Sequence, residues 1–322
     1  MHTVLYTLLA AFILGIILGK ILLPILHKLR FGQNIYELAP EAHKKKQGTP
    51  TMGGLVISGS ALLASLAGLF FYHGPWKFPC AMLILALCNM AIGLADDMTK
   101  IRRGKNGGLT PRQKLVVQTV AALIFAVYCM KNAQAGTSIY VPFLHKELDL
   151  GLLYVPIITF VVVGTTNSAN LLDGLDGLLT SVSMVDFGAF AILSVLMGHT
   201  ELGLVCGALC GACMAFLFYN AFPAQMFMGD TGSMFIGGAV SAVAVLLGQP
   251  LLLILMAFWM MMSSLSDLIQ FAYFRATHGK RIFKMAPIHH HFELCGLHEA
   301  KIVMIYLVTT AMLCMIALAG AL

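Results

Sequence analysis

The chain has 322 residues, of which 59% are hydrophobic and only 11% are charged, and it carries a formal net charge of +6. Because soluble domains carry about 25% charged residues, this composition excludes a soluble globular protein and indicates a membrane protein with many spans. The positive charge does not indicate a nucleic-acid partner, since basic residues also concentrate in the cytoplasmic loops of membrane proteins.

Ten apolar runs are each about 17–25 residues long, the length at which a helix crosses a hydrocarbon core of roughly 30 Å. They cover residues 3–27, 52–72, 78–97, 112–130, 151–167, 176–196, 202–219, 231–248, 250–272 and 302–321. The first run has Lys20 and Pro24 where a signal peptide would have a small-residue cleavage site, so we interpret it as a retained span. We therefore predict an all-α polytopic membrane protein of about ten helices, forming a single domain over residues 1–322.

Basic residues are distributed unevenly between the two sides of this predicted topology. When successive connections are assigned to alternate sides, one side receives sixteen of the twenty Lys and Arg residues. The positive-inside rule places that side in the cytoplasm and both termini outside. On the outer side, the connection 131–150 contains TSIYVPFL and KELDLGLLY, whose β-branched and aromatic residues around a break predict a small β-hairpin.

The first two inner connections combine basic, acidic and glycine residues. The segment KKKQGTPTMGG (44–54) includes Lys46 and Thr51; topology explains its lysines, but the glycine-rich GTPTMGG favours a phosphate-binding entry to a helix. The third span ends on adjacent carboxylates, Asp96 and Asp97, with Lys100 one helical turn later. A salt bridge accounts for one of the two acids. Two desolvated neighbouring carboxylates favour a cation site for phosphate chemistry.

The segment NSANLLDGLDGL (167–178) repeats polar side chains every three residues: Asn167, Asn170, Asp173 and Asp176. A helix continuing from the fifth span would align them on one face. Polar groups at the inner end of a span are costly unless they bind something, and the two Asp-Gly pairs supply turns where backbone approaches a ligand. This segment therefore predicts a ligand-binding surface.

Two later inner segments carry further candidates. In YNAFPAQMFMGDTGS (219–233), Asp230 immediately precedes the eighth span, where it caps the helix or takes part in ligand binding at the helix N-terminus. Phe227 in the same loop stacks on a base or packs in the loop. The segment GKRIFKMAPIHHHFELCGLHE (279–299) contains three consecutive histidines. Adjacent histidines in one loop seldom converge on one zinc ion, so imidazoles that hydrogen-bond or transfer protons beside phosphates fit better.

Two acids lie within predicted spans and call for separate interpretations. Intramembrane acids are functional by default. Asp267 lies near the inner end of the ninth span, within reach of the site, and we leave its role open; we expect Asp186 to pair locally with a hydroxyl or backbone group.

The motifs GLADDMTK, NSANLLDGLDGL, FMGDTGS and GKRIFKMAPIHHHFE, in this order across the ten spans, resemble the phospho-N-acetylmuramoyl-pentapeptide transferase family. That family belongs to the polyprenyl-phosphate N-acetylhexosamine-1-phosphate transferase superfamily, and the histidine segment is typical of its muramoyl branch. The resemblance implies transfer of phospho-MurNAc-pentapeptide from UDP-MurNAc-pentapeptide to undecaprenyl phosphate, giving lipid I and UMP. It also implies Mg²⁺ as cofactor, a role in peptidoglycan synthesis, and an active site on the cytoplasmic face of the bacterial inner membrane.

The resemblance also assigns residues. It implies an essential acidic trio of Asp96, Asp97 and Asp230, with Asp230 the magnesium ligand, and a catalytic role for His290. Substrate contacts are implied for Lys46, Thr51, Lys100, Asn167, Asn170, Asp173, Asp176, Phe227, Gln270, His289 and His291. Leu297 and Asp267 depart from the family pattern, where Trp and an apolar residue are expected.

Several alternatives stay open at this stage. The reaction is either a one-step in-line attack, with Asp96 deprotonating the incoming phosphate, or a double displacement through an Asp nucleophile. A sister transferase using UDP-GlcNAc is disfavoured by the triple-His segment. A secondary transporter would show repeats and interrupted spans near the bilayer midplane, and no repeat is evident. Whether the protein forms a homodimer is also left open.

Overall fold

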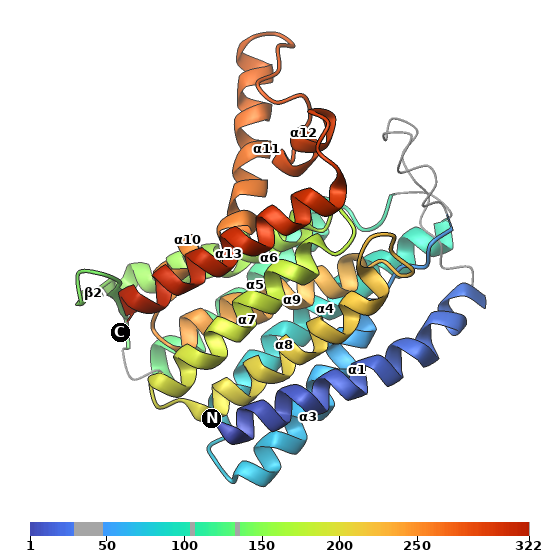
Figure 1. Cartoon of the computed structure of the whole chain (residues 1–322). Helices are drawn as coiled ribbons and strands as arrows, with labels where there is room; N and C mark the ends of the chain where they lie inside the picture. Colours follow the sequence, from blue (N-terminus) through green and yellow to red (C-terminus); the bar gives the residue numbers. More distant parts are fainter. Residues whose placement is uncertain (29–47, 104–106, 133–135, 322) are drawn as a thin grey trace.

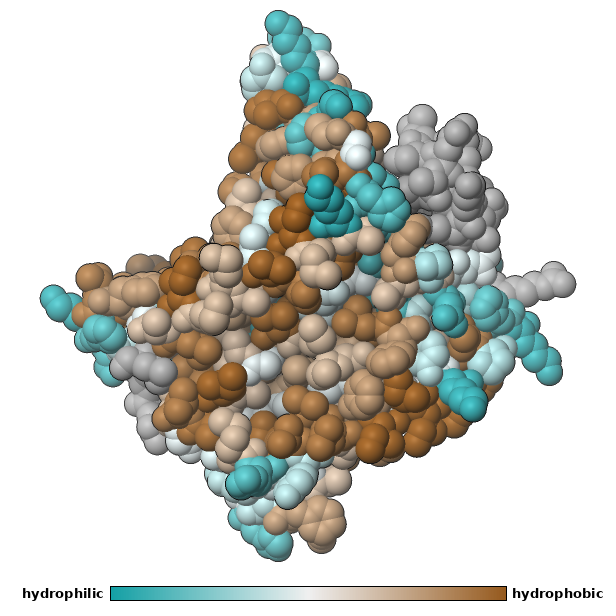
Figure 2. Space-filling model, in the orientation of Figure 1, coloured by the Kyte–Doolittle hydropathy of each residue, from teal (hydrophilic) through white to brown (hydrophobic). Residues whose placement is uncertain are grey.

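The computed structural model describes residues 1–28, 48–103, 107–132 and 136–321, which form a bundle of long helices with one small hairpin (Figure 1). Within these ranges, nine helices are long and apolar enough to cross a membrane, and a bent helix pair makes a tenth candidate span. The space-filling view shows an apolar surface along the bundle, with hydrophilic residues gathered at its ends (Figure 2). The prediction of an all-α polytopic protein is confirmed.

The helix bounds follow the predicted apolar runs closely. The nine long helices are α1 (His2–Lys28), α3 (Gly54–Tyr72), α4 (Lys77–Arg103), α5 (Pro111–Asn132), α6 (Tyr154–Leu172), α7 (Leu178–Leu196), α8 (Thr200–Asn220), α9 (Gly229–Leu246) and α13 (Glu299–Ala321). Among them α9 is the most enclosed, because 89% of the residues in its apolar 18-residue stretch are buried. In the corresponding stretch of α1 only 17% are buried. The chain therefore places α9 in the core and leaves α1 to face lipid.

The predicted ninth span, 250–272, is wrong as one continuous helix. A 3₁₀ turn at Pro250–Leu252 leads into α10 (Leu253–Met256), and α11 (Phe258–Ala276) then departs at an angle of 82°. Figure 1 shows α11 projecting away from the bundle. The start of α11 is attached to α13 through Trp259, whose indole N–H donates to Thr309 Oγ1 at 2.7 Å. No proline or glycine lies at the bend, so the local sequence did not predict it.

The predicted hairpin is confirmed at the end of the bundle where both chain termini lie (Figure 1). Strand β1 (Ser138–Val141) pairs antiparallel with β2 (Lys146–Asp149). The backbone N–H of Phe143 donates to the carbonyl of Gly320, which ties the hairpin to the C-terminal end of α13. The polar motifs of the sequence lie toward the other end, around the last turn of α4 and the first turn of α9.

Candidate active site

Three carboxylates from two helices meet at this end of the bundle. Asp96 and Asp97 lie in the last turns of α4, and Asp230 lies in the first turn of α9. Within the described ranges, they form the one group of three acidic, histidine or cysteine side chains whose ligand atoms all lie within 4.8 Å of one another. The two helices can approach this closely because Gly93 of α4 has no side chain where it contacts the backbone carbonyl of Asp230.

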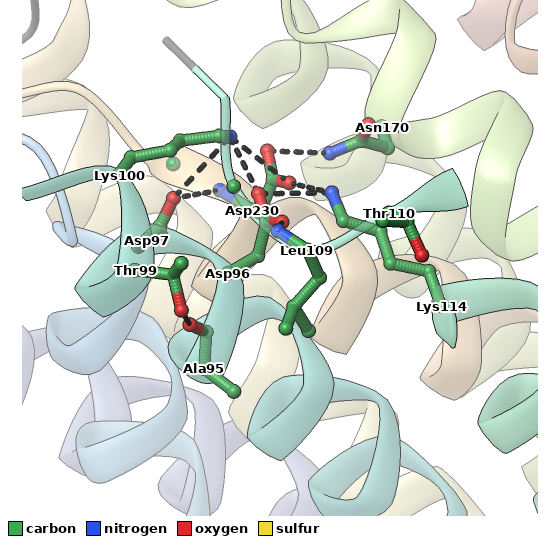
Figure 3. Close-up of polar contacts among 12 residues, drawn as sticks. Ala95, Asp96, Asp97, Thr99, Lys100, Leu109, Thr110, Lys114, Asn170 and Asp230 are labelled. Atoms are coloured by element: carbon green, nitrogen blue, oxygen red, sulfur yellow. Dashed lines mark hydrogen bonds and ion pairs between the residues drawn. The ribbon is translucent and has the colours of Figure 1, made fainter. Parts of the chain in front are cut away.

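The Asp96 carboxylate is fully buried and completely paired. Its Oδ1 accepts the backbone N–H of Leu109 at 2.7 Å, and its Oδ2 forms ion pairs with Lys100 Nζ at 2.7 Å and Lys114 Nζ at 2.9 Å (Figure 3). The side chain is 0% exposed, and Gly108 lies directly against it. The connection between α4 and α5 therefore closes over this acid.

The Asp97 carboxylate caps the N-terminus of α9. Its Oδ2 accepts the backbone N–H of Thr231 at 2.9 Å and the Thr231 hydroxyl at 2.7 Å, while its Oδ1 accepts the N–H of Asp230 at 3.3 Å. A helix N-terminus leaves N–H groups without intrahelical partners and attracts negative charge. The cap of α9 is thus supplied by α4, and Asp230 itself, the second residue of α9, is left to point into the site.

Asp230 connects both lysines to an asparagine. Its Oδ2 lies 2.6 Å from Lys114 Nζ and 3.2 Å from Lys100 Nζ, and its Oδ1 accepts from Asn170 Nδ2 at 3.0 Å (Figure 3). The same amide donates to Ser233 Oγ at 2.8 Å, which fixes its orientation. The Asp230 side chain is 15% exposed, so it is the most accessible carboxylate of the trio.

Lys114 is the residue that the sequence interpretation missed, because it was counted only as a topology-determining charge. It lies in the first turn of α5, where Thr110 and Gln113 form a reciprocal capping pair: the Thr110 N–H donates to Gln113 Oε1 at 3.0 Å, and the Gln113 N–H donates to Thr110 Oγ1 at 3.3 Å. The letters TPRQK carry this capping signature. They predict a helix start that would hold Lys114 in a defined place.

The donor set fits a divalent cation. Carboxylate oxygens are the ligands that Mg²⁺ prefers, usually from one or two acids together with water and substrate phosphate. Asp97 already gives its oxygens to the N-terminus of α9, so Asp96 and Asp230 are the carboxylates able to hold such an ion. The two lysine ammonium groups now occupy the space between those acids and partly neutralise them.

The segment after α6 brings a further acid to the cluster. Asn167 and Asn170 lie on α6, and Asp173 follows its last residue. Burial, together with repulsion from Asp230, Asp97 and Asp176, raises the pKa of Asp173 to about 8. A carboxylic acid whose pKa is raised by burial and by neighbouring acids is a candidate functional group.

The remaining polar residues of that segment face elsewhere. The Asn167 amide donates to Gln118 Oε1 of α5 at 3.0 Å. Asp176 lies beyond the end of α6, so the predicted helical alignment does not extend to it. The Asp176 Oδ2 accepts the N–H of Ala224 at 2.9 Å, and the Asp176 N–H donates to the Glu299 carboxylate. These contacts anchor the turn that carries Asp173.

Thr51 and Phe227 lie on the α3 side of the cluster. The Thr51 hydroxyl and the Asp97 carboxylate both lie 2.7 Å from the point that a Cβ on Gly229 would occupy, and Gly229 has a positive φ of 73°. The backbone N–H of Phe227 donates to Pro50 O at 2.8 Å, and its carbonyl accepts from Gly53 N–H at 2.8 Å. The segment entering α3 is thereby joined to the loop before Asp230. Lys46 lies outside the described residues.

The histidine segment forms a short helix, α12 (Ile288–Leu294). His289 is fully buried and contacts Gly174, the residue after Asp173. The ring of His290 lies 4.3 Å from that of His289, and its Nδ1 lies 3.1 Å from Glu293 Oε2. His289 is thus in contact with the turn that carries Asp173.

His291 and Gln270 contact the loop that precedes α12. His291 Nδ1 accepts the N–H of Lys284 at 3.1 Å. Gln270 Oε1 accepts the N–H groups of Ile282 and Phe283 at 3.1 and 3.0 Å, and its Nε2 donates to Phe283 O at 3.0 Å. These side chains hold the loop against α11.

The two intramembrane acids also have defined surroundings. Asp186 is fully buried in α7, and its Oδ1 accepts from the Cys314 thiol of α13 at 3.5 Å. Its partner is therefore a thiol rather than the hydroxyl or backbone group that the sequence suggested. Asp267 lies on α11, the helix that projects from the bundle.

Comparison with known proteins gives a consistent assignment. The glycosyl transferase family 4 model matches residues 79–248, and signature 1 of phospho-N-acetylmuramoyl-pentapeptide-transferase matches residues 46–57. The phospho-N-acetylmuramoyl-pentapeptide-transferase of Clostridium novyi (strain NT) is 44% identical over 317 residues, covering 98% of this chain and 96% of that protein. The protein of the same name from Clostridium perfringens (strain 13 / Type A) is 45% identical over 314 residues, 96% of each chain. The chain belongs to the phospho-N-acetylmuramoyl-pentapeptide-transferase family.

Proposed function

We propose that this protein transfers phospho-MurNAc-pentapeptide from UDP-MurNAc-pentapeptide to undecaprenyl phosphate, forming lipid I and UMP for peptidoglycan synthesis. The observation that carries the proposal is the cluster of Asp96, Asp230, Lys100 and Lys114 at one end of an apolar bundle. A reaction between a water-soluble nucleotide and a lipid phosphate requires charged groups of both signs at such a boundary. The excess of basic residues near this end supports a cytoplasmic site in the bacterial inner membrane.

Asp230 and Asp96 would hold Mg²⁺ in this proposal. When bound, the ion would neutralise diphosphate charge and orient the phosphoryl group. Asp97 acts as a positioning residue, because it fixes the first turn of α9 and so the direction of the Asp230 side chain.

The lysines would bind the phosphate oxygens of the two substrates. Lys100 forms ion pairs with three carboxylates and Lys114 with two in the present arrangement, and incoming phosphates would take over part of those contacts. Asp96 would then lose ion-pair partners and become able to accept the proton of the lipid phosphate. The developing charge on the departing UMP would be stabilised by the same ammonium groups.

The geometry favours a one-step transfer over a double displacement. A double displacement needs a carboxylate that is free to form a covalent bond to phosphorus, yet Asp97 is committed to capping α9, and Asp96 and Asp230 would hold the cation in this proposal. We expect no phospho-enzyme to accumulate when labelled donor is mixed with the protein in the absence of lipid acceptor. An acid-stable labelled protein band would contradict the one-step scheme.

Residues around Asp173 would bind the donor nucleotide and sugar. Asn170 reaches Asp230 directly, and His289 contacts the Gly174 backbone. Asp173 senses the charges of Asp230 and Asp97, and Thr51 lies beside Asp97 at Gly229. Asp176 and Phe227 would add further contacts to the donor. His290 would contribute an imidazole beside the phosphates.

The test is UMP release by the purified full-length protein supplied with undecaprenyl phosphate. We expect release from UDP-MurNAc-pentapeptide, not from UDP-GlcNAc, and only with Mg²⁺ present. Asp230→Asn should lower turnover by about 10²-fold or more, whereas Asp149→Asn, which removes an exposed acid of the hairpin, should not. Release from UDP-GlcNAc would support the sister transferase, and uptake into vesicles without UMP would support a transporter.

A further inference from the structure

A groove of about 440 Å³ lies between α4 and α5, away from the acidic cluster. Its lining residues recur at helical spacing, including Lys77, Ile84 and Cys88 on α4 and Ala121 and Tyr128 on α5. Lys77 is the one charged residue that lines it. None of these side chains takes part in the site proposed above, so the groove calls for an explanation of its own.

The groove opens toward lipid. Ile84 and Ile124, one from each helix, are 60% and 66% exposed at its sides. Along α4, the eleven-residue step from Lys77 to Cys88 corresponds to roughly 16 Å at 1.5 Å per residue, about half of a ~30 Å hydrocarbon core. An apolar slot of this length extends from the membrane surface to the midplane.

The Lys77 end of the groove carries the features of a membrane interface. Trp76 is 39% exposed beside Lys77, and the Tyr128 hydroxyl donates to the Lys77 carbonyl at 3.1 Å. Trp and Tyr side chains concentrate at headgroup level in membrane proteins. Within the described ranges no carboxylate pairs with the Lys77 ammonium, and the first turn of α4 adds partial positive charge there.

We propose that the α4–α5 groove binds one anionic phospholipid of the leaflet opposite the active site. Its phosphate contacts Lys77 Nζ, and one acyl chain fills the slot between Ile84 and Ala121. The tail of a polyprenyl substrate would bring no anion to Lys77, and a second copy of the chain would bury this cation against an apolar helix surface. A phospholipid satisfies the charge and the apolar slot together.

The test is native mass spectrometry of the full-length protein released from vesicles of phosphatidylcholine and phosphatidylglycerol. We expect wild type to retain one phosphatidylglycerol molecule in preference to phosphatidylcholine. Lys77→Gln should lower that preference about fivefold, the ratio that corresponds to ~1 kcal/mol for one basic residue at an anionic surface. The matched control is Lys131→Gln, which removes a lysine at the same end of the neighbouring helix α5 but outside the groove lining.

A second variant tests the acyl slot. Ala121→Phe should abolish retention of either lipid, whereas Val120→Phe, on the lipid-facing side of α5, should not. If Ala121→Phe does not fold, alkylation of exposed Cys88 on the folded protein in a Cys295→Ser background blocks the same slot. UMP release should persist in the groove variants, which separates this proposal from the proposed function.

Three outcomes would overturn the lipid site. The first is a phosphatidylglycerol adduct that survives both Lys77→Gln and a blocked slot. The second is an equal loss of that adduct in Lys131→Gln. The third is a dimer that dissociates on Ala121→Phe while lipid retention is unchanged, which would assign the groove to a second copy of the chain.

Discussion

At the scale of single residues, adjacent Asp96 and Asp97 have different structural roles. Asp96 pairs with two lysines and a backbone N–H, and Asp97 binds the N-terminal N–H groups of another helix. Two neighbouring acids at the end of a helix point in directions about 100° apart. One therefore turns toward the connection to α5 and the other toward α9.

The capping role of Asp97 predicts a stability effect. Asp97→Ala removes the acceptor for the Thr231 N–H and hydroxyl and should lower the free energy of unfolding by roughly 1–2 kcal/mol. Asp97→Asn keeps one acceptor oxygen and should cost less. Thermal unfolding in detergent measures both. Equal losses in the two variants would show that charge, not capping, is the contribution of Asp97 to stability.

Lys114 predicts an effect on activity. Because it contacts both Asp96 and Asp230, Lys114→Ala should lower the turnover of UMP release by about 10²-fold. Arg112→Ala is the matched control, since it removes an exposed cation from the same first turn of α5. A similar decrease in both variants would mean that Lys114 acts only through the general positive charge of this end.

The raised pKa of Asp173 predicts a dependence of stability on pH. The folded protein keeps this proton up to about pH 8, whereas the unfolded chain releases it near 3.8. Unfolding between these values releases a proton, so the contribution of Asp173 to stability falls as the pH rises from about 4 to 8. Asp173→Asn should show a flatter decline of the unfolding temperature across this window. Parallel curves for the two proteins would contradict the raised pKa.

At the scale of elements, the site depends on how closely three helices approach one another. Gly93 of α4 contacts the Asp230 carbonyl, and Gly54 of α3 contacts Gly232 of α9. Small residues allow helix backbones in membrane proteins to pack directly against each other. The acids belong to a common site because these glycines leave room for the first turn of α9.

A methyl group at this contact should therefore disrupt the site. Gly93→Ala places a Cβ against the Asp230 carbonyl and should cost roughly 1–3 kcal/mol of stability, with a large loss of UMP release because Asp230 is displaced. Gly164→Ala, in the middle of α6 with nothing within 4 Å of its Cβ, should be neutral or slightly stabilising. Unfolding temperature and turnover should be measured for both. Wild-type behaviour of Gly93→Ala would show that α4 and α9 do not need this contact.

At the scale of the whole molecule, the apolar runs predicted the membrane spans well and the bend in the ninth span not at all. The length of a span follows from the thickness of the bilayer, so the length of an apolar run in the sequence predicts a span directly. The bend of 82° between α10 and α11 instead involves the attachment of α11 to α13. The Trp259 indole N–H donates to the Thr309 hydroxyl, and the Trp259 ring stacks on Tyr306 with 3.8 Å between the ring centroids. A contact between residues fifty positions apart does not change the local spacing of apolar residues, so that spacing cannot predict the bend.

The membrane class, the hairpin, the family resemblance and most polar residues of the cluster could be predicted from the amino-acid sequence, because each depends on composition or on a contiguous motif. Which of those residues contact one another follows only from how the helices pack. Lys114 joins Asp96 and Asp230, while Asn167 turns to α5 and Gln270 clamps a loop. The physical reason is that charge pairing and helix capping act through space, so the partner of a side chain depends on the packing of helices that are distant in the sequence.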